Sequence, residues 1–246
     1  MGNTVNLRCT KCWNDAIITQ HYSGLCLCED HFIIDLEGKA KREIRRNRWL
    51  RTGDRIGIAL SGGASSAALL TLLVKLTKNR RDITLAALHI DEGCFDARRG
   101  AEAVASSADV ECIVWKRNPM RSIKDEIAWH ASEAGINVIA WGRNLDDEAQ
   151  AIVTAFISGD IGVLSDDHVA EQIRWIYPFE MIPRDEILLY ARLHHHDLYF
   201  DSKKEADLYT DVRELLINYT ARHPSTLYSV YQLGNRIRRG MPEAKQ

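Results

Sequence analysis

Short apolar runs alternate with helical patterns over most of the chain. Runs typical of strands buried on both faces lie at 56–60, 85–90, 111–115, 138–141 and 173–177. Apolar residues at helical spacing lie at 67–76, 97–107, 123–134, 147–157, 186–193 and 207–219. This alternation predicts an α/β fold with a parallel sheet and helices on both faces. Such sheets bind ligands at the carboxyl ends of their strands, so the loops that follow the strands are candidate sites.

The loop after the first strand has the composition of an anion-binding turn. It reads Ser-Gly-Gly-Ala-Ser-Ser over residues 61–66 and opens a helix. Glycines allow a close approach of the backbone, and the free N–H groups at a helix start bind anions. The loop lacks the Lys-Ser or Lys-Thr of a Walker A motif and the dinucleotide fingerprint. We expect it to bind the phosphates of a nucleotide, with a plain Ser/Gly turn as the alternative.

Two further loops are expected at the same edge of the sheet. Residues 89–94 follow the second strand, and residues 142–150 follow the fourth. In the latter, Asn144 and Asp147 have the spacing of an N-cap pair, whereas the adjacent Asp146 and Asp147 have the chemistry of a Mg²⁺ site. The predicted nucleotide-binding residues are Ala59, Leu60, Ser61, Gly62, Gly63, Ser65, Ser66, His89, Asp91, Gly142 and Asp147.

The cysteines predict a metal site near the N-terminus. Cys9-x-x-Cys12 and Cys28-x-x-His31 each place two ligands on one tight turn, and together they suit a closed, structural Zn²⁺ site. Cys26 is an alternative to Cys28. So short a segment needs a metal to fold, so we expect residues 1–35 to form a zinc knuckle.

A basic segment follows at 36–52. Ile44 and Trp49 are too few to form an apolar face, so we expect a mostly solvated linker helix. It is either an arm that contacts the phosphates of RNA or simply a solvated linker. The candidate RNA-binding residues are Lys41, Arg42, Arg45, Arg46, Arg48 and Arg51.

Composition and charge narrow the remaining possibilities. The 246 residues are 46% hydrophobic and 27% charged, as in globular proteins, and the net charge of −2 argues against a uniformly basic protein. No apolar run approaches the ~20 residues of a membrane span, and no secretory signal is present. We expect a cytoplasmic protein without membrane contact, with its main domain over residues 53–240.

Taken together, these segments resemble the tRNA 2-thiolation family (TtcA/TtuA-like tRNA sulfurtransferases) of PP-loop ATP pyrophosphatases. The knuckle is similar to the family's first zinc site, and Ser61-Gly62-Gly63 to the start of its S-G-G-x-D-S loop. Residues 142–150 are similar to its G-H-N-L-D-D-E-A-Q segment, with Arg143 in place of His. Tyr177-Pro178-Phe179, followed by an Ile-Pro pair at 182–183, resembles a later family segment.

The resemblance implies a chemistry. ATP with Mg²⁺ adenylates a base carbonyl of tRNA, and sulfur then displaces AMP. Asp147 would be a catalytic residue of an active enzyme, and the knuckle and the basic arm would face the tRNA.

The departures from the family pattern fall on the chemistry. Ser65 stands at the loop's Asp position and Ala64 at its Lys position, residues 118–122 contain no C-x-x-C pair, and Lys203 stands at a further cysteine position. Residues 241–246 contain no Cys, so we expect no counterpart of the family's second, C-terminal zinc site. We therefore expect no iron–sulfur cluster.

The leading hypothesis from these departures is a degenerate paralogue. It would bind tRNA or another structured RNA, beside an active thiolation-family subunit or as a homodimer, and would keep weak ATP binding. The alternatives are an active ATP-dependent tRNA 2-thiolation enzyme supplied by an external sulfur carrier, and a scaffold for protein contacts.

Overall fold

A parallel sheet forms the centre of the molecule. The computed structural model describes residues 7–160, 173–194 and 208–240. The sheet has the order β5-β4-β3-β6-β7, and all neighbouring strands are parallel. The strands are β3 (Arg55–Ala59), β4 (Thr84–Asp91), β5 (Glu111–Lys116), β6 (Val138–Ala140) and β7 (Arg174–Ile176). Each lies within one residue of its predicted bounds, and the predicted α/β fold is confirmed.

The strand order reverses at β3. From β3 the chain runs outward through β4 to β5 and then returns to β6 on the other side of β3. At such a reversal the loops that leave neighbouring strands diverge, and a crevice opens at the carboxyl ends of the strands. The loops after β3 and β6 flank this crevice.

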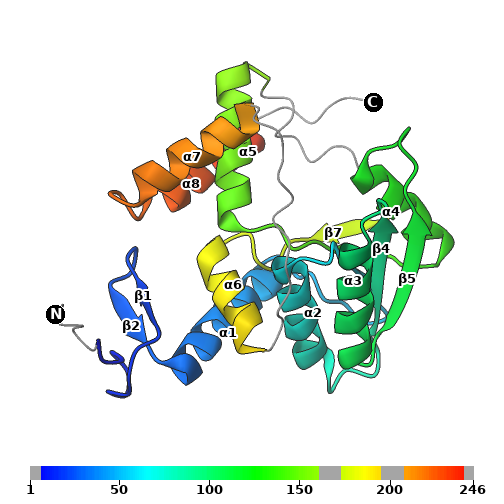
Figure 1. Cartoon of the computed structure of the whole chain (residues 1–246), viewed down its shortest axis with the longest axis horizontal. Coiled ribbons are helices and arrows are strands. Elements are labelled where there is room, and N and C mark those ends of the chain that lie inside the picture. Colours follow the sequence, from blue (N-terminus) through cyan, green and yellow to red (C-terminus); the bar gives the residue numbers. More distant parts are fainter. Residues whose placement is uncertain (1–6, 161–172, 195–207, 241–246) are drawn as a thin grey trace.

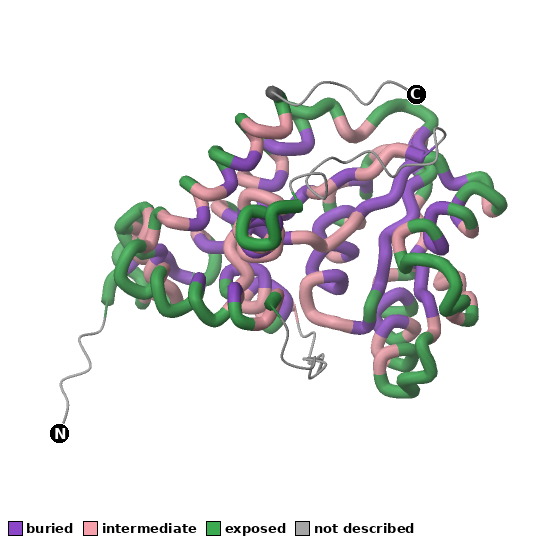
Figure 2. The backbone as a smooth tube through the Cα atoms, turned by 90° about the horizontal axis from the view of Figure 1, so that it is seen from above, coloured by how far each residue is buried: buried purple, intermediate pink, exposed green. Residues whose placement is uncertain are grey.

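Helices cover both faces of the sheet (Figure 1). On one face, α2 (Ala64–Thr77) and α3 (Phe95–Ser107) share a buried cluster with α1 (Glu29–Arg46) and α6 (Arg184–Leu193). On the other, α4 (Ile123–Glu133) packs against β4 and β6 through a second cluster that contains Ile127, Ala128 and Ala131. Burial concentrates in the strands and in the inner sides of these helices (Figure 2).

Three more helices form a group beside the sheet domain. They are α5 (Leu145–Ser158), α7 (Leu208–Thr220) and α8 (Thr226–Gly240). Their buried side chains, which include Leu145, Val212, Leu216 and Tyr231, form a third cluster. Figure 1 shows them together beyond the N-terminal end of α6. None of the described helices is both long enough and apolar enough to cross a membrane.

The N-terminal region differs from the expected linker. A small hairpin, β1 (Ile18–Gln20) and β2 (Leu25–Leu27), leads into α1, which already begins at Glu29. Its buried stripe, Phe32, Leu36, Ala40 and Ile44, recurs every four residues. The expectation of a mostly solvated helix is therefore wrong. The division of the chain at 35 and 52 stays a prediction, although α1 crosses residue 35 without a break.

Candidate nucleotide cavity and metal site

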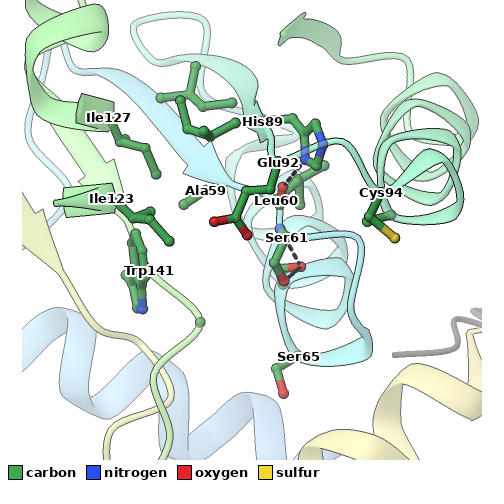
Figure 3. A pocket seen from close by; sticks show the side chains of 15 residues that line it. Ala59, Leu60, Ser61, Ser65, His89, Glu92, Cys94, Ile123, Ile127 and Trp141 are labelled. Carbon is green, nitrogen blue, oxygen red and sulfur yellow. Dashed lines mark hydrogen bonds between the residues drawn. The ribbon is translucent and has the colours of Figure 1, made fainter. Parts of the chain in front are cut away.

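A cavity of about 220 Å³ opens at the carboxyl ends of β3, β4 and β6 (Figure 3). Of the predicted nucleotide-binding residues, those that line it are Ala59, Leu60, Ser61, Ser65, Ser66, His89 and Gly142. Gly142 lies directly against Ser65 and Ser66, because a Cβ at this glycine would stand 3.3 Å from the Ser65 carbonyl. The loops after β3 and β6 therefore meet, as the sequence predicts.

The glycine loop is held by its own hydroxyls. The Ser66 hydroxyl donates to the Gly63 carbonyl at 2.9 Å and accepts from the Ser61 N–H at 3.3 Å. Gly62 has φ +83°, and a Cβ there would stand 2.4 Å from the Ala97 carbonyl at the start of α3. Gly62 is therefore required by packing on α3. Neither Gly62 nor Gly63, the N-cap of α2, lines the cavity.

His89 presents a hydrogen-bond acceptor at the cavity. Its side chain is 3% exposed, and its Nδ1 lies 2.7 Å from the Leu60 carbonyl oxygen. Because a carbonyl only accepts, Nδ1 carries the hydrogen and donates. In the neutral ring, Nε2 is then an acceptor, and this buried atom has no hydrogen-bond partner among the described residues. An orphaned acceptor at a cavity wall indicates a ligand with an N–H or O–H donor.

The two carboxylates of the loop after β4 face different surroundings. Asp91 lies outside the cavity, where its side chain accepts from the Gly93 N–H at 2.8 Å and pairs with Arg98 at 3.3 Å. The Gly93 N–H and the Arg98 guanidinium lower the pKa of Asp91. Glu92 and Cys94 line the cavity instead, on the side opposite Trp141 in Figure 3. The predicted nucleotide-binding residues include neither of them, although both lie in the predicted loop at 89–94.

Asp147 takes the structural role that the sequence left open. Asn144 Oδ1 accepts from the Asp147 N–H at 3.0 Å, and Asp147 Oδ2 accepts from the Asn144 N–H at 3.2 Å, which makes a capping box for α5. Asp146 accepts from the Arg184 N–H. Both carboxylates line a different cavity of about 540 Å³, and burial raises the pKa of each. Their role toward Mg²⁺ or in catalysis stays a prediction.

The nucleotide cavity carries little charge. No Lys or Arg of the described chain lines it, and Glu92 is its only carboxylate. Ile123 and Ile127 from α4, with Trp141 from the end of β6, form an apolar wall that sequence reasoning missed (Figure 3). The i, i+4 spacing of the two isoleucines and the place of Trp141 beside Gly142 were the available signals. Such a cavity favours a flat, uncharged group over a phosphate chain.

The four predicted metal ligands come together. The ligand atoms of Cys9, Cys12, Cys28 and His31 all lie within 4.8 Å of one another. Cys28 Sγ lies 3.3 Å from His31 Nδ1 and 3.5 Å from Cys12 Sγ. Burial opposes ionisation of the Cys9 thiol, but hydrogen bonds from backbone N–H groups outweigh it and lower the pKa to about 6. Because the thiolate is the form that binds metal, this set fits a tetrahedral ion.

The basic residues of the arm are not equivalent. Lys41 pairs with Glu37 at 3.5 Å and Arg46 with Glu43 at 2.8 Å, each within one turn of α1. Arg42, Arg45, Arg48 and Arg51 are exposed, and the described residues offer none of them an ion pair. Their guanidinium groups are the ones available to a phosphate backbone.

Comparison with known proteins now identifies the family. A model of the N-terminal LIM domain of the 2-thiouridine synthetase TtuA matches residues 8–33, and a model of the PP-loop domain matches residues 36–219. The chain belongs to the PP-loop family. Within it, the predicted resemblance to the tRNA thiolation proteins is confirmed.

Individual relatives agree with this assignment. The tRNA 2-thiolation protein NcsA of Haloferax volcanii is 26% identical over 91% of this PP-loop protein and 84% of its own length. The tRNA-5-methyluridine(54) 2-sulfurtransferase of Pyrococcus horikoshii is 26% identical, with 75% and 67% covered. The solved structure of the U34-tRNA thiolase NcsA from Methanococcus maripaludis superposes with a TM-score of 0.86 at 22% identity, over 98% of this chain and 90% of that one.

One expectation is overturned by this comparison. We expected no iron–sulfur cluster, but the Methanococcus maripaludis thiolase carries a 4Fe–4S cluster on the same fold. The expectation assumed that missing family cysteines exclude a cluster. Thiolates bind iron as well as zinc, and the N-terminal cysteine set is itself a group of thiolate ligands. Lys203, which entered that argument, lies outside the described residues.

Proposed function

We propose that this PP-loop protein is a tRNA-binding paralogue that binds a nucleotide weakly and does not itself transfer sulfur to tRNA. The observation that carries the proposal is the chemistry of the nucleotide cavity. Its Ser hydroxyls, its apolar wall and the unpartnered Nε2 of His89 suit a nucleoside, but the described lining has no cation for a triphosphate. Without such a cation, a developing charge on pyrophosphate lacks electrostatic stabilisation.

The exposed face of α1 supports the tRNA part of the proposal. Arg42 and Arg45 are exposed on the last turns of α1, and Arg48 is exposed two residues beyond its end. The opposite face of the helix is anchored on α2 and α6. A rigid helix end, with guanidinium groups that form no ion pair with the described residues, neutralises phosphates without losing much entropy on binding. The relatives named as tRNA thiolation proteins make tRNA the RNA to test first.

Salt-dependent tRNA binding tests the arm. Changing Arg42, Arg45 and Arg48 together to Gln should weaken binding and flatten the log–log salt dependence by about 0.9 for each lost phosphate contact. The matched control changes Lys41 and Arg46 to Gln, since their charges are engaged by Glu37 and Glu43. Equal losses in the two variants would contradict the assignment of the arm.

Turnover tests the remaining part. With ATP, Mg²⁺, a sulfur donor and tRNA, we expect tRNA binding with neither AMP release nor thiolated nucleoside above the protein-free level. Robust release of AMP and pyrophosphate together with thiolated tRNA would establish the second candidate, an active thiolation enzyme, which the names of the relatives favour.

We further propose that the tetrad of Cys9, Cys12, Cys28 and His31 holds a structural zinc ion. Three thiolates and an imidazole are a common closed zinc set, and the metal would cross-link the residues before the hairpin to the start of α1. Metal analysis of protein purified without oxygen should measure zinc, iron and sulfide together, and about one zinc per chain is expected at this site.

A further inference from the structure

Four of the six tryptophans of the chain gather around α4. Trp115 on β5, Trp141 after β6 and Trp175 on β7 pack against the buried cluster that α4 covers. Trp129 lies on α4 itself and is 48% exposed. Burial explains the contacts of the first three rings, but nothing in the described chain explains a half-exposed tryptophan on the outer side of the helix.

The rings form two groups, one beside β5 and one beside β7, and each group has a cation over one of its rings. In the first, Trp115 and His130 are parallel with centroids 4.5 Å apart, Trp129 meets His130 edge-on at 4.7 Å, and the Arg121 guanidinium lies 4.6 Å from the Trp129 centroid. In the second, Trp141 lies 5.7 Å from Trp175, and Lys124 Nζ lies 5.4 Å from Trp175 and 5.7 Å from Tyr177. We call Arg121, Lys124, Trp129, His130, Trp175 and Tyr177 the α4 platform.

The charge around the α4 platform is positive. Lys116, Arg117, Arg121 and Lys124 lie within nine residues. Arg117 is paired with the buried Glu126 and, at 3.7 Å, with Glu92, so the positive charge comes from Lys116, Arg121 and Lys124. Asp125 is the exposed acid of this stretch, and its carboxylate accepts from the Ser122 hydroxyl at 2.7 Å. Burial lowers the pKa of His130, so its ring is mainly neutral at pH 7 and stacks without a charge.

We propose that the α4 platform binds an unpaired segment of RNA, with a base stacked on Trp129 and phosphates contacted by Arg121 and Lys124. Alternating rings and cations suit single strands, because unpaired bases expose faces that a duplex buries in its own stack. Trp141, which contacts Trp175 of the second group, also lines the nucleotide cavity (Figure 3).

This inference rests on the proposed function, since it gives the bound tRNA a second contact besides the arm of α1. The two contacts differ in chemistry. The arm offers exposed guanidinium groups alone and suits the backbone of a duplex, whereas the platform offers faces for stacking. Loss of either contact should therefore leave the RNA binding that the other contact provides.

The test uses the full chain with two fluorescent probes, an oligouridine of about ten nucleotides and an RNA hairpin without unpaired ends. Trp129→Ala should weaken oligouridine binding roughly tenfold and hairpin binding little. Trp129→Phe should retain most of the affinity, because it keeps an aromatic face. Phe156→Ala, at an exposed aromatic of α5, is the matched control and should bind like the wild type. Arg121→Gln should lower the salt slope for oligouridine by about one.

Each outcome decides the matter. Oligouridine affinity that is unchanged in Trp129→Ala, or equally reduced in Trp129→Phe, would overturn the platform. If tRNA binding still depended on the α1 arginines in that case, the proposed function would stand without it. A wild-type chain that binds neither tRNA nor oligouridine would overturn both. A thermal melt of each variant shows whether a loss of affinity comes from unfolding.

Discussion

At the scale of single residues, Cys26 and Cys28 provide a test of the metal site. They are two residues apart, but Cys28 Sγ belongs to the tetrad, whereas Cys26 Sγ lies 3.5 Å from the Thr19 hydroxyl and outside it. Cys28→Ser should abolish the tightly bound metal and lower the melting temperature by several degrees, because the metal links the knuckle to α1. Cys26→Ser should keep both. Equal metal content in the two variants would show that another ligand set holds the ion.

Glu180 is the residue from which we expect a pH effect on stability. Burial raises the pKa of its carboxyl to about 7, and the nearby charges of Glu148 and Glu43 add to this. Ionising Glu180 therefore costs more in the folded than in the unfolded chain. Below the ordinary pKa of 4.5, Glu180 is protonated in both the folded and the unfolded chain, and it costs no stability. As the pH rises from 4.5 to about 7, the unfolded chain ionises more readily than the folded one, so the folded state loses stability. Above pH 7 this loss stays constant.

Glu180→Gln should remove this cost. The variant should gain on the wild type as the pH rises, by about 2 kcal/mol in the free energy of unfolding at pH 8, while the two should converge near pH 4. Urea denaturation at a series of pH values measures the difference. A gap that is constant across the series would mean that Glu180 does not titrate in this range.

At the scale of elements, the capping box fixes the start of α5, and with it the loop that lies against Ser65. Asn144 is 3% exposed, and its side chain is the acceptor for the Asp147 N–H. Asn144→Ala should destabilise the protein by about 1–2 kcal/mol, because it leaves a buried N–H without a partner. Asn144→Ser, which keeps an oxygen acceptor, should cost much less. Equal losses of stability in denaturant would argue against the cap.

The elements also show how far sequence reasoning reached. Strands such as 85–90 were found because parallel strands buried on both faces are apolar at consecutive positions. The buried face of α1 was not predicted, because a boundary at residue 35 separates Phe32 from the rest of its stripe and only Ile44 and Trp49 were counted as apolar in the segment that follows. The direction of the Asp147 side chain, toward its own cap, depends on χ angles and neighbours that no periodicity reveals.

At the scale of the whole molecule, the cavity depended on three loops that only the sheet order brings together. The cavity walls at Ser61 and His89 were predictable, because each residue lies at the carboxyl end of a strand that the sequence identifies. The apolar wall of Ile123 and Trp141 was not predictable in the same way, because it needs α4 to pack on the opposite face of the sheet. Side chains that meet only through tertiary packing carry no local signal.

The knuckle is joined to the PP-loop domain by a buried ionic cluster. Lys39 of α1 pairs with Glu186 of α6 at 3.1 Å and with Asp35 at 2.8 Å, and the Tyr22 hydroxyl from the hairpin turn donates to Glu186. The Lys39 and Glu186 side chains are 16% and 3% exposed. The hairpin, α1 and α6 thus meet at the Lys39 ammonium group, which balances the charges of Asp35 and Glu186.

Two lysines on α1 therefore make a matched pair. Lys39→Met should lower the free energy of unfolding by about 3 kcal/mol, because it leaves the Glu186 carboxylate buried without a counter-charge. Lys41→Met removes the ion pair of Lys41 with Glu37. Because the Lys41 side chain is 39% exposed, this loss should lower the free energy of unfolding by less than about 1 kcal/mol. Urea denaturation measures both, and limited proteolysis should cut the hairpin around residues 20–25 faster only in Lys39→Met. If both variants lost the same stability and resisted the protease alike, the cluster would not be what anchors the knuckle, and the contact of α1 with α2 and α6 through its apolar stripe would have to carry that role alone.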